Sequence, residues 1–323
     1  METKIFKILS DMSEELNYQQ LEKLQQVLLS RLGTESNEEE KVLGNDDYLD
    51  LFISAKRVEG CTDRTIEYYR STIDKMLQEL DIPVRRITTE VLRRYLTDYQ
   101  MKNNCSKVTI DNVRRNLSSF FSWLEDEDHI IKSPIRRIHK VKTGTVVKET
   151  LSDEQIEVLR DGCHCMRDLA IIDLLYSTGM RVGELCNLDI EDINFNEREC
   201  VVYGKGNKER RVYFDAKAKL HLKRYIESRK DSNKALFVTL DYPADRLSIH
   251  AVEHRLKILG RKLNINKVHP HKFRRSMATK AIDKGMPIEQ VQKLLGHQQI
   301  DTTMHYAMVN QANVKIAHRK FIG

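Results

Sequence analysis

Apolar residues recur every three or four positions through most of the chain, which is the period of an amphipathic α-helix. In residues 1–33 this repeat is broken near residues 17–20, so we expect two short helices there. The apolar stripes consist of Ile5, Leu9, Met12, Leu16, Leu21, Leu24, Leu28 and Leu32. These stripes either dock on the following domain or pair between subunits, and of the two we favour pairing.

The same period continues through residues 46–132 and predicts a helical domain of four or five helices. Thr88 stands where it can cap one of these helices, with Glu90 in the first turn. Another helix is anchored by apolar residues and by the only tryptophan, which we assign to the core: Ile110, Val113, Leu117, Phe120, Phe121 and Trp123. Ser133-Pro134 closes the domain, because proline disfavours helix at the residue before it.

Beyond residue 149 the pattern is helical again, apart from one segment. Ser152 followed by Gln155 predicts a capping box at the start of the first helix. Further helices are expected over residues 166–177, 216–228, 249–263, 274–284 and 288–295. Residues 199–214 instead alternate with a period of two around Gly204–Asn207, which predicts a β-hairpin. The fold class is therefore mainly α with a small antiparallel β-sheet.

Charge and turn residues divide the chain into four parts. Residues 1–45 form an N-terminal helical extension that ends in an acidic linker, and residues 46–135 form the helical domain. Residues 136–148 are a basic linker around Thr143-Gly144-Thr145, and residues 149–323 form the second domain with an amphipathic tail after residue 309. A chain of 323 residues is long enough for two separate cores.

The composition, 40% hydrophobic and 32% charged, is typical of a folded, helix-rich protein. No apolar run approaches the roughly 20 residues that span a bilayer, and the N-terminus lacks the form of a signal peptide, so we expect no membrane contact and a cytoplasmic location. Of the six cysteines, only Cys163-His164-Cys165 forms a cluster. Because no second ligand pair has zinc-like spacing, we predict reduced thiols, no metal site and no cofactor.

The net charge of +6 is unevenly distributed, because residues 1–45 are acidic and the rest is basic. Repeated basic pairs on the predicted helices and linkers favour a surface that follows the phosphates of double-stranded DNA. The candidate DNA-contact residues are Arg114, Arg115, Arg136, Arg137, Lys140, Lys142, Lys208, Lys272 and Arg275.

A set of chemically suited side chains lies in the second domain: Arg181, Lys205, His271, Arg274, His297 and Tyr306. Two guanidinium groups can neutralise the non-bridging oxygens of a phosphodiester, and a tyrosine hydroxyl can attack the phosphorus without a metal. The His-x-x-Arg spacing places His271 and Arg274 one helical turn apart on the same side. Lys205, with Lys208 as its rival, lies at the tip of the predicted hairpin, where an ammonium group could protonate the leaving oxygen.

With these motifs the sequence resembles the tyrosine site-specific recombinase family, the phage integrases and Xer-type recombinases, over nearly the whole chain. The resemblance implies a two-domain, C-shaped DNA clamp, in which residues 46–135 are the core-binding domain. It also implies that Tyr306 forms a 3′-phosphotyrosyl link, that Glu184 supports Arg181 from behind, and that Lys205 is the acid. His271 would accept the tyrosine proton or hold the phosphate, and His297 would donate to a phosphoryl oxygen.

The resemblance further implies strand exchange through a Holliday junction, by a homotetramer on paired inverted-repeat core sites of a mobile element or chromosome. An accessory directionality protein is a possible partner, and the tail Val309–Gly323 would dock on a neighbouring subunit. Two alternatives stay open: a type IB topoisomerase-like enzyme that nicks and closes one duplex, and a DNA-binding protein without catalysis.

Overall fold

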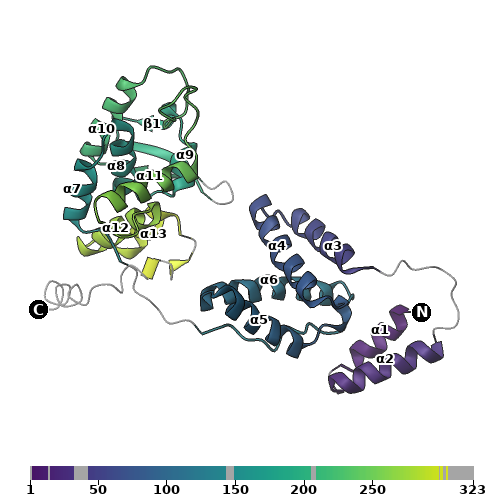
Figure 1. Ribbon diagram of the computed structural model, residues 1–323. Coiled ribbons are helices and arrows are strands. Elements are labelled where there is room, and N and C mark those ends of the chain that lie inside the picture. Colours follow the sequence, from purple (N-terminus) through teal and green to yellow (C-terminus); the bar gives the residue numbers. More distant parts are fainter. Residues whose placement is uncertain are drawn as a thin grey trace, which may run out of the picture. The chain divides into compact units, whose positions relative to one another are not determined.

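The structure, a computed structural model, describes residues 2–13, 15–32, 43–142, 149–204, 209–297, 299–300 and 303–304. The chain divides into two compact units, Met1–Thr145 and Val146–Gly323, each with a hydrophobic core of its own (Figure 1). Within these described ranges, no helix combines the length and the apolar character needed to cross a lipid bilayer.

The first unit contains the helical domain predicted from the sequence. Its elements are α3 (Asn45–Val58), α4 (Asp63–Leu80), the short 3₁₀ helix η1 (Val84–Arg86), α5 (Thr89–Asn103) and α6 (Lys107–Asp126). The core contains an aromatic cluster in which the Phe52 ring packs edge-on against Phe120 and Trp123. The assignment of Trp123 to the core is therefore confirmed.

Side-chain caps begin the helices of this unit. Thr88 accepts a hydrogen bond from the backbone N–H of Val91 at 3.4 Å, as expected, and Ser106 accepts one from Thr109 at 3.2 Å. Both α4 and α5 end at a residue in the left-handed conformation, Asp81 and Asn104. Short polar side chains tolerate this conformation better than other non-glycine residues do, so both helix ends follow from the local sequence.

The N-terminal stripes form a helical hairpin of α1 (Glu2–Asp11) and α2 (Tyr18–Leu32). Ile5, Leu9 and Leu21 are buried between the two helices, and Ile131 at the end of the helical domain packs against the same cluster. Within the chain, the stripes pack against each other and against Ile131, so the first unit already covers part of their apolar surface. The pairing between subunits that we favoured stays a prediction.

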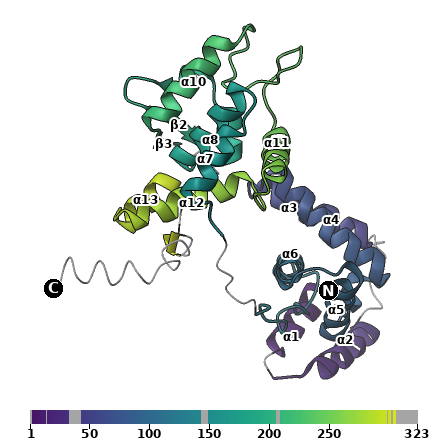
Figure 2. The same ribbon diagram turned by 60° about the vertical axis from the view of Figure 1, so that its left-hand side comes forward.

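The second unit is built around α8 (Met166–Thr178), which packs against α10 and α12 and is surrounded by other helices in both views (Figures 1 and 2). The other helices are α7 (Asp153–Asp161), α9 (Val182–Asn187), the 3₁₀ helix η2 (Ile190–Asp192), α10 (Ala216–Ser228), α11 (Ile249–Lys262), α12 (Pro270–Asp283) and α13 (Ile288–Leu295). Ser152 caps α7, and Gln155 completes the predicted capping box. Helix α8 is buried on several faces, because the consecutive residues Ala170, Ile171 and Ile172 and then Leu174 and Leu175 all lie in the core.

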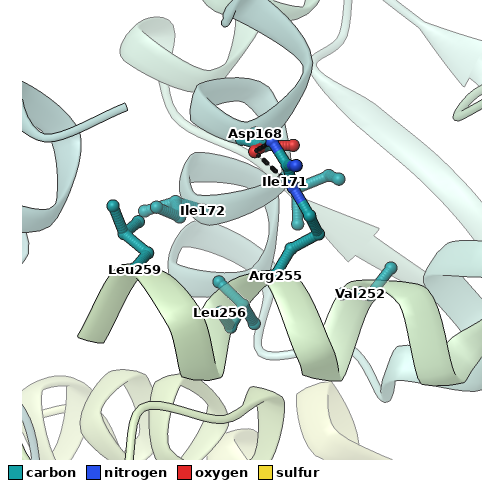
Figure 3. A pocket seen from close by; sticks show the side chains of 7 residues that line it. All are labelled: Asp168, Ile171, Ile172, Val252, Arg255, Leu256 and Leu259. Atoms are coloured by element: carbon teal, nitrogen blue, oxygen red, sulfur yellow. Dashed lines mark hydrogen bonds and ion pairs between the residues drawn. The ribbon is translucent and has the colours of Figure 1, made fainter. Parts of the chain in front are cut away.

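Helix α11 passes beside α8, and Leu256 and Leu259 line a small pocket with Ile171 and Ile172 (Figure 3). The ion pair between Arg255 and Asp168, at 2.6 Å, joins the two helices beside this apolar contact. Apolar packing and one partly exposed ion pair therefore hold α11 in place.

A three-stranded antiparallel sheet, in the order β1-β2-β3, is formed by β1 (Ile193–Asn194), β2 (Glu199–Tyr203) and β3 (Glu209–Tyr213). Val202 pairs with Arg210, and the last pair before the turn joins Tyr203 to Glu209. The predicted hairpin is confirmed, and the short strand β1 adds to it an edge that the sequence did not predict.

One predicted helix boundary was wrong. We expected the helix containing Arg274 to begin at that residue, but α12 begins four residues earlier, at Pro270, with His269 as its N-cap. Proline is accepted at the first helical position, where a backbone N–H has no partner within the helix. His271 and Arg274 therefore both lie in the first turns of one helix.

Candidate active site

Arg181 lies at the junction between α8 and α9. Helix α8 ends at Gly179 in the left-handed conformation (φ +63°), and a Cβ there would stand 2.1 Å from the Cε atom of Met277. Glycine is needed at this turn for both its conformation and its size. Arg181 then serves as the N-cap of α9, so the tight turn determines where its side chain emerges.

Glu184 binds Arg181 twice. Its Oε1 atom accepts from the guanidinium Nη1 at 2.9 Å, and its Oε2 atom accepts from the backbone N–H of Arg181 at 2.7 Å. Burial pushes the pKa of Glu184 up, but the hydrogen bonds from Arg210 and Arg181 outweigh it and hold the pKa below its usual value. The carboxylate is therefore charged and holds Arg181 by side chain and backbone together.

The sequence analysis missed Arg210 of β3. Its guanidinium donates to both oxygens of Glu184 at 2.7 Å, and its Nε donates to the Leu294 carbonyl at 3.0 Å. The alternation of the hairpin held a signal for it, because Arg210 shares a strand face with the buried Val212 and so points inward. A charged residue at an inward position requires a buried partner, and here that partner is Glu184.

Arg274 is buried on α12, and two backbone carbonyls orient its guanidinium. Nη1 donates to the carbonyl of Gly179 at 2.7 Å, and Nη2 donates to that of Leu295 at 2.6 Å. His271, one turn earlier, is exposed. Although the residue as a whole is exposed, neighbouring atoms partly desolvate its ring, and this desolvation and the charge of Arg274 lower the pKa of His271.

His297 follows Gly296, the left-handed residue that ends α13 (φ +66°). Its Nδ1 atom lies 2.8 Å from the hydroxyl of Thr303, a fully buried residue, and its carbonyl accepts from Gln292 Nε2 at 3.1 Å. Burial lowers the pKa of His297 to about 4, helped by the charges of Arg274, Arg181 and Arg210. The ring is therefore neutral near pH 7 and can donate a hydrogen bond through only one nitrogen.

The structure brings together four of the six predicted reactive residues. Arg181 and Arg274 both reach carbonyls at the end of α13, those of Gly296 (3.5 Å) and Leu295, and His297 follows directly. His271 shares α12 with Arg274. Lys205 and Tyr306 lie outside the described residues. Two guanidinium groups and two imidazoles from α9, α12 and the end of α13 thus form one cationic cluster suited to a phosphate.

In the described part of the chain, no group of three or more His, Cys, Asp or Glu side chains is arranged to hold a metal ion. The side chains of the cluster itself are cationic or hydrogen-bonding groups. Such groups can stabilise negative charge on a phosphoryl group directly.

The predicted DNA-contact residues differ in exposure. Arg115, Arg136, Arg137, Lys140 and Lys142 are exposed. Arg114 is mostly enclosed and donates to Asp111 at 2.9 Å, and Arg275 donates to the Glu149 carbonyl at 2.6 Å. Lys208 lies outside the described residues.

Lys272, which we predicted to contact DNA, is only 4% exposed. Its ammonium group donates to the carbonyl of Asn266 at 2.8 Å, and burial lowers its pKa. A phosphate contact by Lys272 would first have to break this internal hydrogen bond.

Comparison with known proteins gave consistent matches. The sequence profile described as the phage integrase family matches residues 149–313, and that of the phage integrase N-terminal SAM-like domain matches residues 48–131. Tyrosine recombinase XerA of Pyrococcus horikoshii is 31% identical over 286 residues, which is 87% of this chain and 96% of the relative. Tyrosine recombinase XerC of Oceanobacillus iheyensis is 29% identical over 84% of this chain and 95% of the relative.

Solved structures share the fold. The XerH site-specific recombinase bound to a palindromic difH substrate superposes with a TM-score of 0.68 and 19% identity, covering 97% of this chain and 93% of that one. A lambda integrase dimer bound to a COC′ core site gives a TM-score of 0.67 and 18% identity over 88% of this chain and 85% of that one.

Proposed function

Because this chain belongs to the phage integrase family and is a site-specific tyrosine recombinase, we propose that it cleaves and rejoins DNA through Tyr306. The observation that supports this most directly is the convergence of Arg181, Arg274 and His297 on the end of α13. A phosphodiester bound beside this segment would meet the guanidinium groups of Arg181 and Arg274 and the neutral imidazole of His297.

In the proposed reaction, the Tyr306 oxygen attacks the phosphorus in line, and its proton passes to His271. The bond from phosphorus to the 5′-oxygen breaks, and Lys205 protonates the leaving 5′-oxygen. Arg181 and Arg274 neutralise the non-bridging oxygens as charge builds on them, and His297 donates to one of them. Since the product is a 3′-phosphotyrosyl ester, a 5′-hydroxyl from another strand can reverse the steps without ATP.

We further propose that residues 46–135 form a core-binding domain, which with the catalytic domain holds duplex DNA. Exposed basic residues of the first unit, such as Arg115 and Arg136, would contact phosphates. The relatives named as tyrosine recombinases favour strand exchange over the topoisomerase-like alternative. We also propose that the protein exchanges strands as a tetramer and acts in the cytoplasm. In this proposal its gene lies on a mobile element, and an accessory protein sets the direction of recombination.

The test uses a core site selected with this protein from a library of randomised inverted-repeat duplexes. A nicked suicide duplex carrying that site should trap a protein–DNA adduct on a denaturing gel. Tyr306→Phe should abolish the adduct but keep binding, since only one hydroxyl is lost. The control Tyr242→Phe changes a fully exposed tyrosine and should leave adduct formation unchanged. An adduct that persists in Tyr306→Phe would show that another residue is the nucleophile.

A further inference from the structure

We propose that Arg210 is a positioning residue for Arg181, acting through Glu184. The inference rests on the proposed function, since it concerns the phosphate-binding arginine of that reaction. It assigns a role in catalysis to a largely enclosed side chain of β3.

The carboxylate of Glu184 joins the two arginines. Its Oε1 atom accepts from Nη1 of Arg181 at 2.9 Å and from Nη1 of Arg210 at 2.7 Å. Its Oε2 atom accepts from the backbone N–H of Arg181 and from Nη2 of Arg210, both at 2.7 Å. Each oxygen therefore takes one hydrogen bond from each arginine, and the fork of Arg210 leaves the carboxylate only one orientation toward Arg181.

Arg210 also contacts the end of α13. Its Nε donates to the Leu294 carbonyl at 3.0 Å, and a Cβ added to Gly296 would stand 2.9 Å from its Cδ atom. The next two carbonyls of this segment, those of Leu295 and Gly296, accept from Arg274 and Arg181. The guanidinium of Arg210 thus connects β3 to Glu184, which holds Arg181, and to the segment that precedes His297.

The exposed fractions of the three side chains show which of them can contact substrate and which can only position another side chain. The side chain of Glu184 is 3% exposed, that of Arg210 is 12% exposed, and that of Arg181 is 37% exposed. Only Arg181 reaches outward, so the two enclosed side chains act on substrate through it. Replacing a buried ion pair with apolar residues of similar size often leaves a protein equally stable or more stable. Stability alone therefore does not account for the Arg210–Glu184 pair, and we assign to it the role of orienting Arg181.

The first test compares Arg210→Ala and Arg210→Lys with the matched control Arg211→Ala. Arg211 is the next residue on β3, its side chain is 66% exposed, and it forms an ion pair with Glu199. At saturating protein, the single-turnover rate constant for cleavage of the suicide duplex should fall about 10- to 100-fold in both Arg210 variants. Lysine should not rescue, because an ammonium group cannot form the fork. Affinity for the duplex should stay within about threefold of wild type, and Arg211→Ala should cleave normally.

The second test asks whether Arg210 acts through Glu184. The double variant Arg210→Ala/Glu184→Ala should cleave little more slowly than Glu184→Ala alone, because without the carboxylate only the hydrogen bond of Arg210 to the Leu294 carbonyl is left to lose. If the two losses multiply, Arg210 acts independently and the inference is wrong.

Folding is checked by the thermal unfolding midpoint of each variant. If Arg210→Ala does not fold, Arg210→Lys keeps the charge and most of the stem, and normal cleavage by this variant would overturn the inference. Cleavage that falls only in proportion to DNA affinity would overturn it as well. A wild-type protein that forms no adduct would refute the proposed function itself, a result distinct from all of these.

Discussion

At the scale of single residues, the surroundings of His297 set its protonation state. Burial lowers the pKa of the ring most, and the charges of Arg274 on α12, Arg181 at the start of α9 and Arg210 on β3 lower it further. The hydroxyl of Thr303 lies 2.8 Å from Nδ1 and fixes the orientation of the ring. A neutral ring donates without adding a further charge to a cluster that already holds several cations.

This protonation state predicts a pH dependence of stability. The pKa of His297 is about 4 in the folded protein, against an ordinary value of 6.5. Between these values the unfolded chain binds a proton that the folded protein excludes, so acidification over this range favours unfolding. His297→Gln should lose less stability than wild type as the pH falls from 6.5 to 4, measured by urea unfolding.

The matched control is His250→Gln, which changes an exposed ring on α11 and should follow the wild-type pH profile. A profile of His297→Gln that coincides with wild type would show that the folded protein does not exclude the proton from this ring.

At the scale of elements, local capping explains where several helices begin, and this can be tested on α6. Ser106 accepts from the backbone N–H of Thr109 at 3.2 Å. Ser106→Ala leaves that N–H without its cap and should destabilise the first unit by about 1 kcal/mol. The measurement is urea unfolding followed by the fluorescence of Trp123, the only tryptophan, which lies on the same helix.

Ser122→Ala is the control for this experiment, since Ser122 is exposed in the interior of α6. Alanine is the better helix former, so this change should be neutral or slightly stabilising. Equal destabilisation by both changes would contradict a capping role for Ser106.

At the scale of the whole molecule, we expect DNA binding to depend steeply on salt. A clamp that neutralises six or more phosphates should lose on the order of a thousandfold in affinity between about 50 and 200 mM salt. Fluorescence anisotropy of the selected duplex measures this slope. Arg136→Ala, at an exposed residue of the first unit, should reduce the slope by about one phosphate contact. A flat response would argue against the clamp.

Assembly is the second prediction at this scale, and it concerns a tail that lies outside the described residues. Removing residues after Asn310 should spare binding to a single site but reduce cooperative filling of paired sites and recombination. The reason is that Ile316 and Phe321 would otherwise face water in a free amphipathic segment. Gel shifts on one-site and two-site duplexes measure the difference.

Ile316→Ala and Phe321→Ala should reproduce the truncation, and Asn313→Ala is the polar control within the same tail. Unchanged cooperativity in the truncated protein would remove the tail from the account of assembly.

The sequence by itself determined the features that depend on neighbouring residues. The capping box of Ser152, the caps of α5 and the alternation of the hairpin each involve groups a few positions apart, so local rules suffice. The motifs also identified Arg181, His271, Arg274 and His297, which the structure brings together. The first turn of α12 was missed because a histidine cap followed by proline is a weak start signal.

Only the tertiary structure decided which distant groups meet. Arg210 reaches Glu184 across 26 residues, and Arg274 reaches Gly179 across 95. Burial, likewise, is a property of the packed chain. It turned Lys272 toward the carbonyl of Asn266 and lowered the pKa of His297, although both residues look like ordinary basic side chains in the sequence. Residue type supplies the chemistry of a side chain, but packing decides its partners, because desolvation and long-range contacts arise only when the chain folds.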